Sequence, residues 1–195
     1  MDASPVCCDG FSEMQYKDVQ FYVPEIAKLN KKSPTFVFEE SKKNYFSAYR
    51  LPDYPVYFLL LESLLRRANG YHANPGWLYV APKVLLLDER FNVMQSVEPE
   101  LKVDARNGFS MDGLLKLTSQ YKYMIVYPAK GFSESVGELD ARPQLKTIYS
   151  GKGLPTFYTD PGSKSTLGTT PKGKVRLTFI DPFNKPEQPS ADSAL

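Results

Sequence analysis

A two-residue alternation of apolar and polar side chains is the feature of this sequence that most constrains its fold. In KVRLTF, residues 174–179, every second side chain is apolar, which is the pattern of a strand that buries one face and exposes the other. YKYMIVY, residues 121–127, places its tyrosines and Ile125 on one face and Met124 and Val126 on the other, and a proline closes it. This pattern is typical of a central strand.

Further strands are predicted where short apolar or aromatic runs are bounded by turn residues. These runs are residues 35–40, 44–51, 56–65, 83–89 and 114–119. Dipeptides such as Pro52-Asp53 and Asn107-Gly108 separate them, and this spacing is typical of an all-β sandwich or barrel. We therefore predict a mostly β fold, an antiparallel β-sandwich of the Ig-like or jelly-roll type. Ser119-Gln120 would join residues 114–119 and 121–127 as a hairpin.

Two segments carry helix-start signals, so one or two short helices are also expected. FSEMQYKDV, residues 11–19, would be capped by Ser12, and FSESVGELD, residues 132–140, by Ser133.

The chain of 195 residues suits one main domain. We expect a single β-rich domain over residues 1–183. Within it, residues 151–173 are rich in Gly, Pro, Ser and Thr and predict a long loop or a loose hairpin. Residues 184–195 predict a disordered tail or a linker.

The charges exclude some partners. Lys and Arg number 24 against 22 Asp and Glu, for a net charge of +2, and they form no basic stripe. This argues against nucleic acid as the main partner, because phosphate binding needs clustered cations. No run approaches the roughly 20 apolar residues that cross a bilayer, so no membrane-spanning segment is expected. Residues 1–5 lack the pattern of an export signal, which leaves open whether a signal was removed.

Cys7 and Cys8 are the two cysteines of the chain. Neighbouring cysteines close only a small, strained ring, so a pair of half-buried thiols and a vicinal disulfide are both open. A metal site would need further Cys or His ligands, and His72 is the single histidine. Neither a metal nor a cofactor is therefore expected. Val6 is not the small residue that a lipid anchor on Cys7 would normally follow.

No set of residues predicts catalysis. His72 lies in a turn-rich segment without a serine-nucleophile motif. Asp88 and Glu89 end an apolar strand, and adjacent strand residues point to opposite faces, so these two carboxylates do not face each other across a bond. No catalytic residue is proposed, and the protein is not expected to be an enzyme.

The segment around the single tryptophan is the most interesting one for binding. Tyr71, Trp77 and Tyr79 lie within a few residues of each other, with Asn74 between them. Aromatic rings stack on the apolar faces of sugars, and asparagines hydrogen-bond their hydroxyls. Tyr71, Asn74, Trp77 and Tyr79 are thus the candidate ligand-binding residues. The alternative is that Trp77 and Tyr79 enter the core while Tyr71 covers an edge.

Several segments, taken in order, resemble the maltose operon periplasmic protein (MalM) family. They are PVCCDGFSEMQY, FSAYRLP, VAPKVLLLDERFNV and GLLKLTSQYKYMIVYPA, with GKVRLTFIDPF a weaker echo. Residues 151–173 have no counterpart in the family. The resemblance implies export to the periplasm of a Gram-negative bacterium, with a lipid anchor on the precursor of some members, and an association with carbohydrate uptake. It implies no catalytic residues. VLLLDE would then be a core strand, with Asp88 accepting backbone N–H groups in the turn toward Phe91.

We expect a non-catalytic periplasmic accessory or binding protein of carbohydrate uptake or the cell envelope, with an oligosaccharide as its ligand. One alternative is a protein-interaction module of an envelope or secretion assembly, which pairs with a protein partner through an exposed sheet edge or through residues 151–174. A carboxylate-based hydrolase is the least favoured alternative, because it needs two facing carboxylates.

Overall fold

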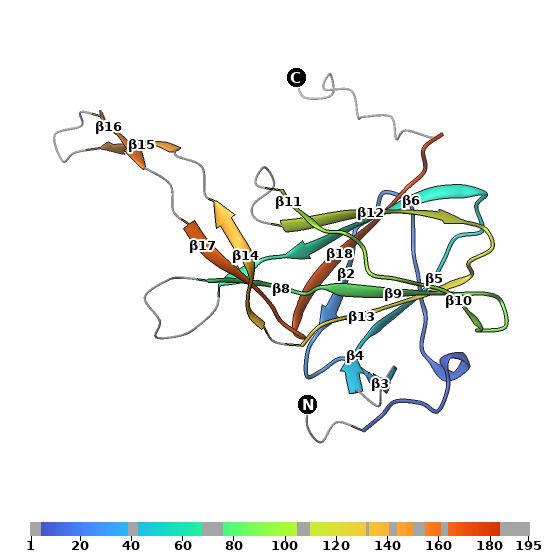
Figure 1. Cartoon of the computed structure of the whole chain (residues 1–195). Coiled ribbons are helices and arrows are strands. Elements are labelled where there is room, and N and C mark those ends of the chain that lie inside the picture. Colours follow the sequence, from blue (N-terminus) through green and yellow to red (C-terminus); the bar gives the residue numbers. More distant parts are fainter. Residues whose placement is uncertain are drawn as a thin grey trace.

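A sandwich of two five-stranded sheets forms the body of the computed structural model (Figure 1). The structure describes residues 5–38, 43–67, 76–104, 110–131, 133–140, 144–149, 155–160 and 164–183. Sheet A has the order β1 (Lys17–Asp18), β5 (Ser47–Arg50), β13 (Tyr123–Pro128), β9 (Pro82–Leu87) and β10 (Val93–Val97). Sheet B has the order β11 (Lys102–Asp104), β12 (Ser110–Thr118), β6 (Val56–Leu64), β18 (Gly173–Ile180) and β2 (Glu25–Leu29).

The predicted mostly β, antiparallel sandwich is confirmed. Neighbouring strands in the two sheets are antiparallel except for β1 and β5. The Ig-like or jelly-roll type stays a prediction. Within the described residues, no helix is long and apolar enough to cross a membrane.

The main core lies between the two sheets. Tyr57, Leu59 and Leu61, alternate residues of β6, are fully buried there together with Met124 and Val126 of β13. Burying one such side chain contributes about 1.5–3 kcal/mol, so the two-residue alternation specifies which face of each strand turns inward. The face predicted for Met124 and Val126 is confirmed.

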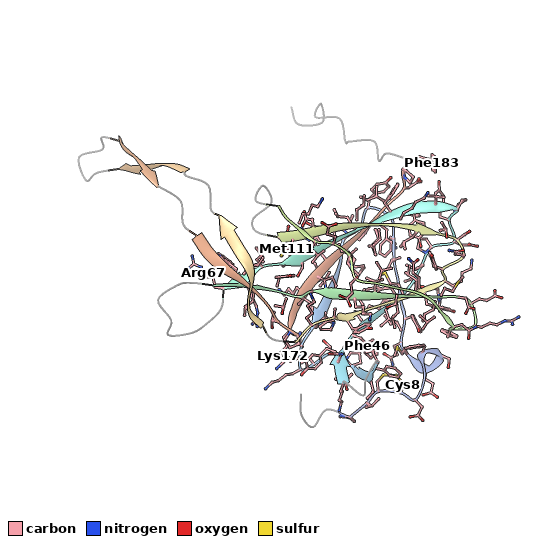
Figure 2. All side chains as sticks on the ribbon, viewed as in Figure 1. Cys8, Phe46, Arg67, Met111, Lys172 and Phe183 are labelled. Atoms are coloured by element: carbon pink, nitrogen blue, oxygen red, sulfur yellow. A yellow bond between two sulfur atoms is a disulfide. The ribbon has the colours of Figure 1, made fainter. Side chains whose placement is uncertain are left out.

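A second apolar cluster covers the other face of sheet A. Leu85, Leu87 and Ile125 are buried in it, beneath the N-terminal segment and the hairpin β3 (Thr35–Val37) and β4 (Lys43–Tyr45). Cys8 and Phe46, labelled in Figure 2, belong to this cluster. Strand β9 is therefore buried on both faces, which explains why its sequence is a continuous apolar run.

A smaller four-stranded sheet extends from the sandwich, with a hairpin at its far end in Figure 1. The sheet has the order β14 (Ser133–Asp140), β17 (Lys164–Thr169), β8 (Trp77–Tyr79) and β7 (Arg66–Arg67). The hairpin consists of β15 (Gln144–Tyr149) and β16 (Pro155–Asp160).

The hairpin predicted through Ser119-Gln120 is wrong. β12 pairs with β6 and β11 in sheet B, and β13 pairs with β5 and β9 in sheet A. The turn therefore carries the chain from one sheet to the other. Alternation shows which face of a strand is buried but not which strand pairs with it. Any strand with a matching apolar face could be the partner.

Both predicted helices are wrong. Residues 11–19 form one short 3₁₀ turn, η1 (Phe11–Glu13), without a side-chain cap, and then enter β1. Tyr16 packs against Tyr123, with ring centroids 4.6 Å apart and ring planes tilted by 51°, so packing on sheet A overrides the local helix signal. Residues 133–140 form β14, which pairs with β17.

The expected loop over residues 151–173 contains two strands, β16 and β17. β16 completes the hairpin with β15, and β17 pairs with β14 and β8. β16 thus pairs with the strand directly before it in the chain, and β17 pairs with strands more distant in sequence, despite the turn-rich composition of the segment. The predicted tail, residues 184–195, lies outside the described residues.

Candidate functional site

Only part of the predicted aromatic site lies within the residues that the structure describes. Tyr71 and Asn74 lie outside the described residues, as does His72. Trp77 and Tyr79 lie two positions apart on β8, so they share one face of that strand, and both are half-buried. The Cζ atom of Arg67, the residue opposite Trp77 on β7, is 5.5 Å from the Trp77 ring centroid.

Tyr79 lines a small hollow of about 100 Å³ whose rim carries Glu98 and Lys130. Burial raises the pKa of the Tyr79 hydroxyl. One side of the Trp77 ring already meets a guanidinium, which is a cation–π contact. Trp77 and Tyr79 therefore form a partly covered aromatic surface with charged neighbours.

The two acidic residues that directly follow β9, Asp88 and Glu89, have different surroundings. Asp88 Oδ1 accepts the backbone N–H groups of Arg90 and Asn92, each at 2.8 Å, as predicted for this turn. Phe91, between them, has φ 63°. The side chain and then the backbone of Asn92 hold the pKa of the Asp88 carboxyl below its ordinary value. Glu89 is exposed, and Asp88 has a structural role in the tight β9–β10 turn.

A groove of about 1000 Å³ lies on the described surface. It lies between the free edge of β2 in sheet B and the N-terminal segment with β5 in sheet A. The residues lining it come from four places: Cys7 and 13–17, 24–26 with Lys28 and Asn30, 32–34, and 46–48.

Hydrogen bonds around β2 establish which of its backbone groups point into this groove. Tyr22 N–H, just before β2, donates to Phe179 O at 2.8 Å, so the C=O of Phe179 faces the β2 side of β18. Backbone direction alternates along a strand, and Val175 therefore directs its N–H and C=O at its partner Ala27. It follows that Ile26 and Lys28 direct theirs away from β18.

The turn after β2 gives the same result independently. Asn30 N–H donates to Ser33 Oγ at 3.1 Å, and Ser33 Oγ donates to the C=O of Lys28. The backbone C=O of Lys28 and the N–H of Asn30 thus face away from β18. Because backbone direction alternates along a strand, the N–H and C=O groups of Ile26 face the same way. Among the described residues, no strand pairs with this edge of β2.

The opposite wall of the groove has a second partly open edge. β1 pairs only with Tyr49 and Arg50, at one end of β5. Ser47 and Ala48, at the other end, line the groove. The groove is therefore bordered by backbone on both sides, which suits an extended polypeptide more than a compact ligand.

The charges on the groove are unequal. Lys17, Lys28 and Lys32 are exposed and line it, and none of the three forms an ion pair with another described residue. Of the two carboxylates, Glu13 already accepts the N–H of Asp9 at 2.9 Å, and Glu25 is half-buried. With three lysines and two glutamates along it, the groove carries a net charge of +1.

Cys7 and Cys8 are joined by a disulfide with an S–S distance of 2.05 Å. Cys7 is exposed and lines the groove, and Cys8 is buried in the second apolar cluster. Across the described residues, no group of three or more His, Cys, Asp or Glu side chains is arranged to hold a metal ion.

No family model, no curated protein and no solved structure matches this chain.

Sequence reasoning missed the groove because it missed β2. Glu25–Leu29 is short, and its buried residues are only Ala27 and Leu29. A faint signal exists: the alternation of these two with Ile26 and Lys28, directly after Pro24, fits an edge strand.

Proposed function

We propose that the protein is a non-catalytic binding protein that holds an extended segment of a partner polypeptide in the groove, as an added strand on β2. The observation that carries this proposal is the outward direction of the backbone N–H and C=O groups of Ile26 and of the N–H group of Lys28, whose C=O accepts a hydrogen bond from Ser33 Oγ. Strand addition uses such groups for affinity, and it uses neighbouring side chains for specificity.

Charge favours an acidic segment as the occupant. Lys17, Lys28 and Lys32 would face its carboxylates. A second copy of β2 would instead bring its own Lys28 into the groove, and lysine on an edge strand opposes such self-pairing. Complementary charge also speeds association and makes it sensitive to salt.

Short peptides test this function. One peptide alternates valine with glutamate, a second alternates valine with lysine, and a third alternates proline with glutamate. The glutamate peptide is expected to bind at least about tenfold more tightly than the lysine peptide, which corresponds to about 1.4 kcal/mol, and more weakly as salt rises. The proline peptide should not bind, because every second residue lacks the N–H group that a strand donates. If none of the peptides binds in calorimetry, the groove is not a strand-binding site.

The resemblance to the MalM family supports a periplasmic location for such a protein and a partner from the cell envelope. Both remain predictions. Fractionation of cells that express the full precursor would test the location.

A saccharide site at Arg67, Trp77 and Tyr79 is the second candidate. Its specific support is the pair of half-buried rings on one face of β8 with a guanidinium beside them, because aromatic rings with adjacent polar groups bind sugars. Titration with maltose, longer maltodextrins and cell-wall glycans, followed by Trp77 fluorescence, would test it. A saturable change that calorimetry no longer detects in Trp77→Ala is expected. Heat and fluorescence that stay flat for every glycan would eliminate this candidate.

A further inference from the structure

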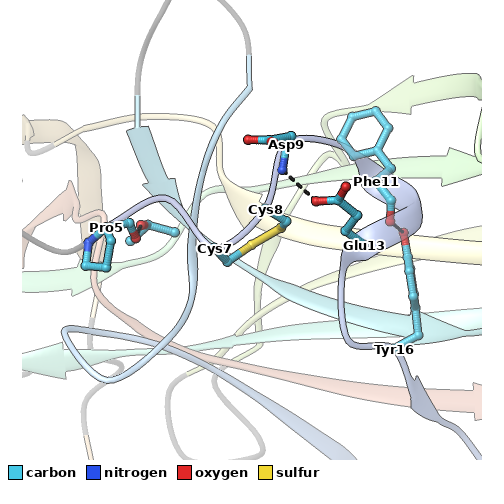
Figure 3. Close-up of a disulfide and its surroundings, with 8 residues drawn as sticks. Pro5, Cys7, Cys8, Asp9, Phe11, Glu13 and Tyr16 are labelled. Carbon is cyan, nitrogen blue, oxygen red and sulfur yellow. Dashed lines mark hydrogen bonds between the residues drawn. A yellow bond between two sulfur atoms is a disulfide. The ribbon is translucent and has the colours of Figure 1, made fainter.

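Cys7, one half of the Cys7–Cys8 disulfide drawn in Figure 3, lines the groove. Cys7 lines the groove and is exposed to solvent, whereas Cys8 is 9% exposed and packs in the second apolar cluster. The bond thus connects the binding surface to the packing under it. Its two sulfur atoms differ in access, and an attacking thiolate would reach the one on Cys7.

The segment around the disulfide is held by few contacts. Cys7 N–H donates to the C=O of Thr35 at 2.9 Å, and Thr35 Oγ1 donates to the C=O of Pro5 at 2.8 Å. On the other side of the disulfide, Asp9 N–H donates to Glu13 Oε2 (Figure 3). These bonds position the start of the wall that continues through residues 13–17.

We propose that the Cys7–Cys8 disulfide is a redox switch that sets the affinity of the groove for a strand, an inference that rests on the function proposed above. The oxidised ring fixes the backbone of Cys7 and Cys8 in the conformation in which Cys7 N–H reaches the C=O of Thr35 in β3, and so keeps the wall in its binding position. Reduction opens the ring, frees this segment and lowers the affinity.

The reductant is a dithiol, either a small molecule or a protein with two neighbouring cysteines. One of its thiolates attacks Cys7 Sγ, the Cys7–Cys8 bond breaks, and Cys8 leaves as a thiolate that takes up a proton. The second thiol then attacks the mixed disulfide and releases Cys7 as a thiol. In total the protein gains two electrons and two protons, and the dithiol becomes a disulfide.

Comparison of the oxidised and the reduced protein tests the switch. Affinity for the valine–glutamate peptide is measured before and after treatment with dithiothreitol, with the free thiols counted by alkylation and mass spectrometry. We expect two thiols to appear and the affinity to fall about tenfold, because an unconstrained wall must be ordered on binding. The control is Cys7→Ser with Cys8→Ser, which should bind like the reduced protein and not respond to dithiothreitol.

Hydrogen exchange provides a readout that does not need the peptide. Reduction should accelerate exchange of the Cys7 amide, which donates to Thr35, while the amide of Ala27 in sheet B keeps its rate. If the oxidised protein binds no peptide, the proposed function fails, and exchange still tests the switch. If the peptide binds equally to both forms, or if exchange at Cys7 does not change, the switch is refuted and the binding function stands.

Discussion

Replacing Ile26 with proline tests the free edge of β2 without disturbing the edge that pairs with β18. Proline has no N–H group, and the N–H of Ile26 faces the groove rather than β18. The substitution therefore removes no ladder hydrogen bond, and proline is tolerated on an edge strand when its nitrogen faces outward. The cost to folding is limited to part of a half-buried side chain, about 1 kcal/mol.

Ala27→Pro is the matched control. The N–H of Ala27 points at Val175 of β18, and its side chain is fully buried. Proline there removes a ladder bond and clashes with the neighbouring strand, at a cost of about 3 kcal/mol or more. Urea unfolding of the two variants measures this difference directly.

Peptide binding should respond strongly to Ile26→Pro although folding does not. Ile26→Pro removes one hydrogen bond to an added strand, which is about 1–1.5 kcal/mol, and places the proline ring at the edge. Calorimetry should record at least about a tenfold loss of affinity for the valine–glutamate peptide. Peptide affinity equal to that of the unmodified protein would refute strand addition at β2. Equal destabilisation by the two prolines would refute the assigned backbone direction.

Three other expectations concern the scaffold. In Gly173→Ala the new Cβ would lie 2.6 Å from Val80 Cγ2, which is fully buried, so urea unfolding should show a loss of about 1–3 kcal/mol; Gly131→Ala, with nothing within 4 Å, should be neutral, and equal values would contradict the packing. Asp88→Ala should lower the thermal midpoint at neutral pH. Because the folded pKa of Asp88 is depressed, the difference from the unmodified protein should vanish as the pH falls through that pKa, and a pH-independent difference would count against the hydrogen-bonded carboxylate. Burial raises the pKa of Tyr49 to about 12 from 10.0, so its folded form stays protonated where the unfolded form ionises, and the free energy of unfolding should fall as the pH rises above about 10; a Tyr49→Phe variant that is equally sensitive to alkali would contradict this assignment.

Local alternation predicted six of the ten strands of the sandwich, β5, β6, β9, β12, β13 and β18, and missed β1, β2, β10 and β11. Residues 174–179 lie within β18 and residues 123–127 of the predicted run 121–127 lie within β13, because a strand with one or two buried faces must place apolar side chains at every second position or throughout. The turn role of Asp88 was also predictable, since a short carboxylate after a strand accepts nearby backbone N–H groups.

Long-range pairing was not predictable from the same patterns. β12 and β13 are consecutive and strongly patterned, yet they pair in different sheets. The N-terminal segment has helix signals, but Phe11 and Tyr16 pack over sheet A instead. In both cases the partner surface is distant in sequence, so no local signal encodes it.

The candidate site was predicted least well. Trp77 is conspicuous in the sequence as the single tryptophan, and in the structure it is half-buried beside Arg67. The groove depends on backbone groups of β2, and backbone groups are the same in every sequence. A strand edge becomes a binding site only when the pairing of the sheet leaves it without a neighbouring strand.

Amide hydrogen exchange resolved at single residues tests the central claim most directly. In the free protein, Ala27 and Leu29 should exchange slowly because their N–H groups face β18, and Ile26 and Lys28 should exchange quickly. Addition of the valine–glutamate peptide should slow exchange at Ile26 and Lys28 and leave the other two unchanged. Fast exchange at Ile26 and Lys28 in the presence of saturating peptide would contradict strand addition at this edge.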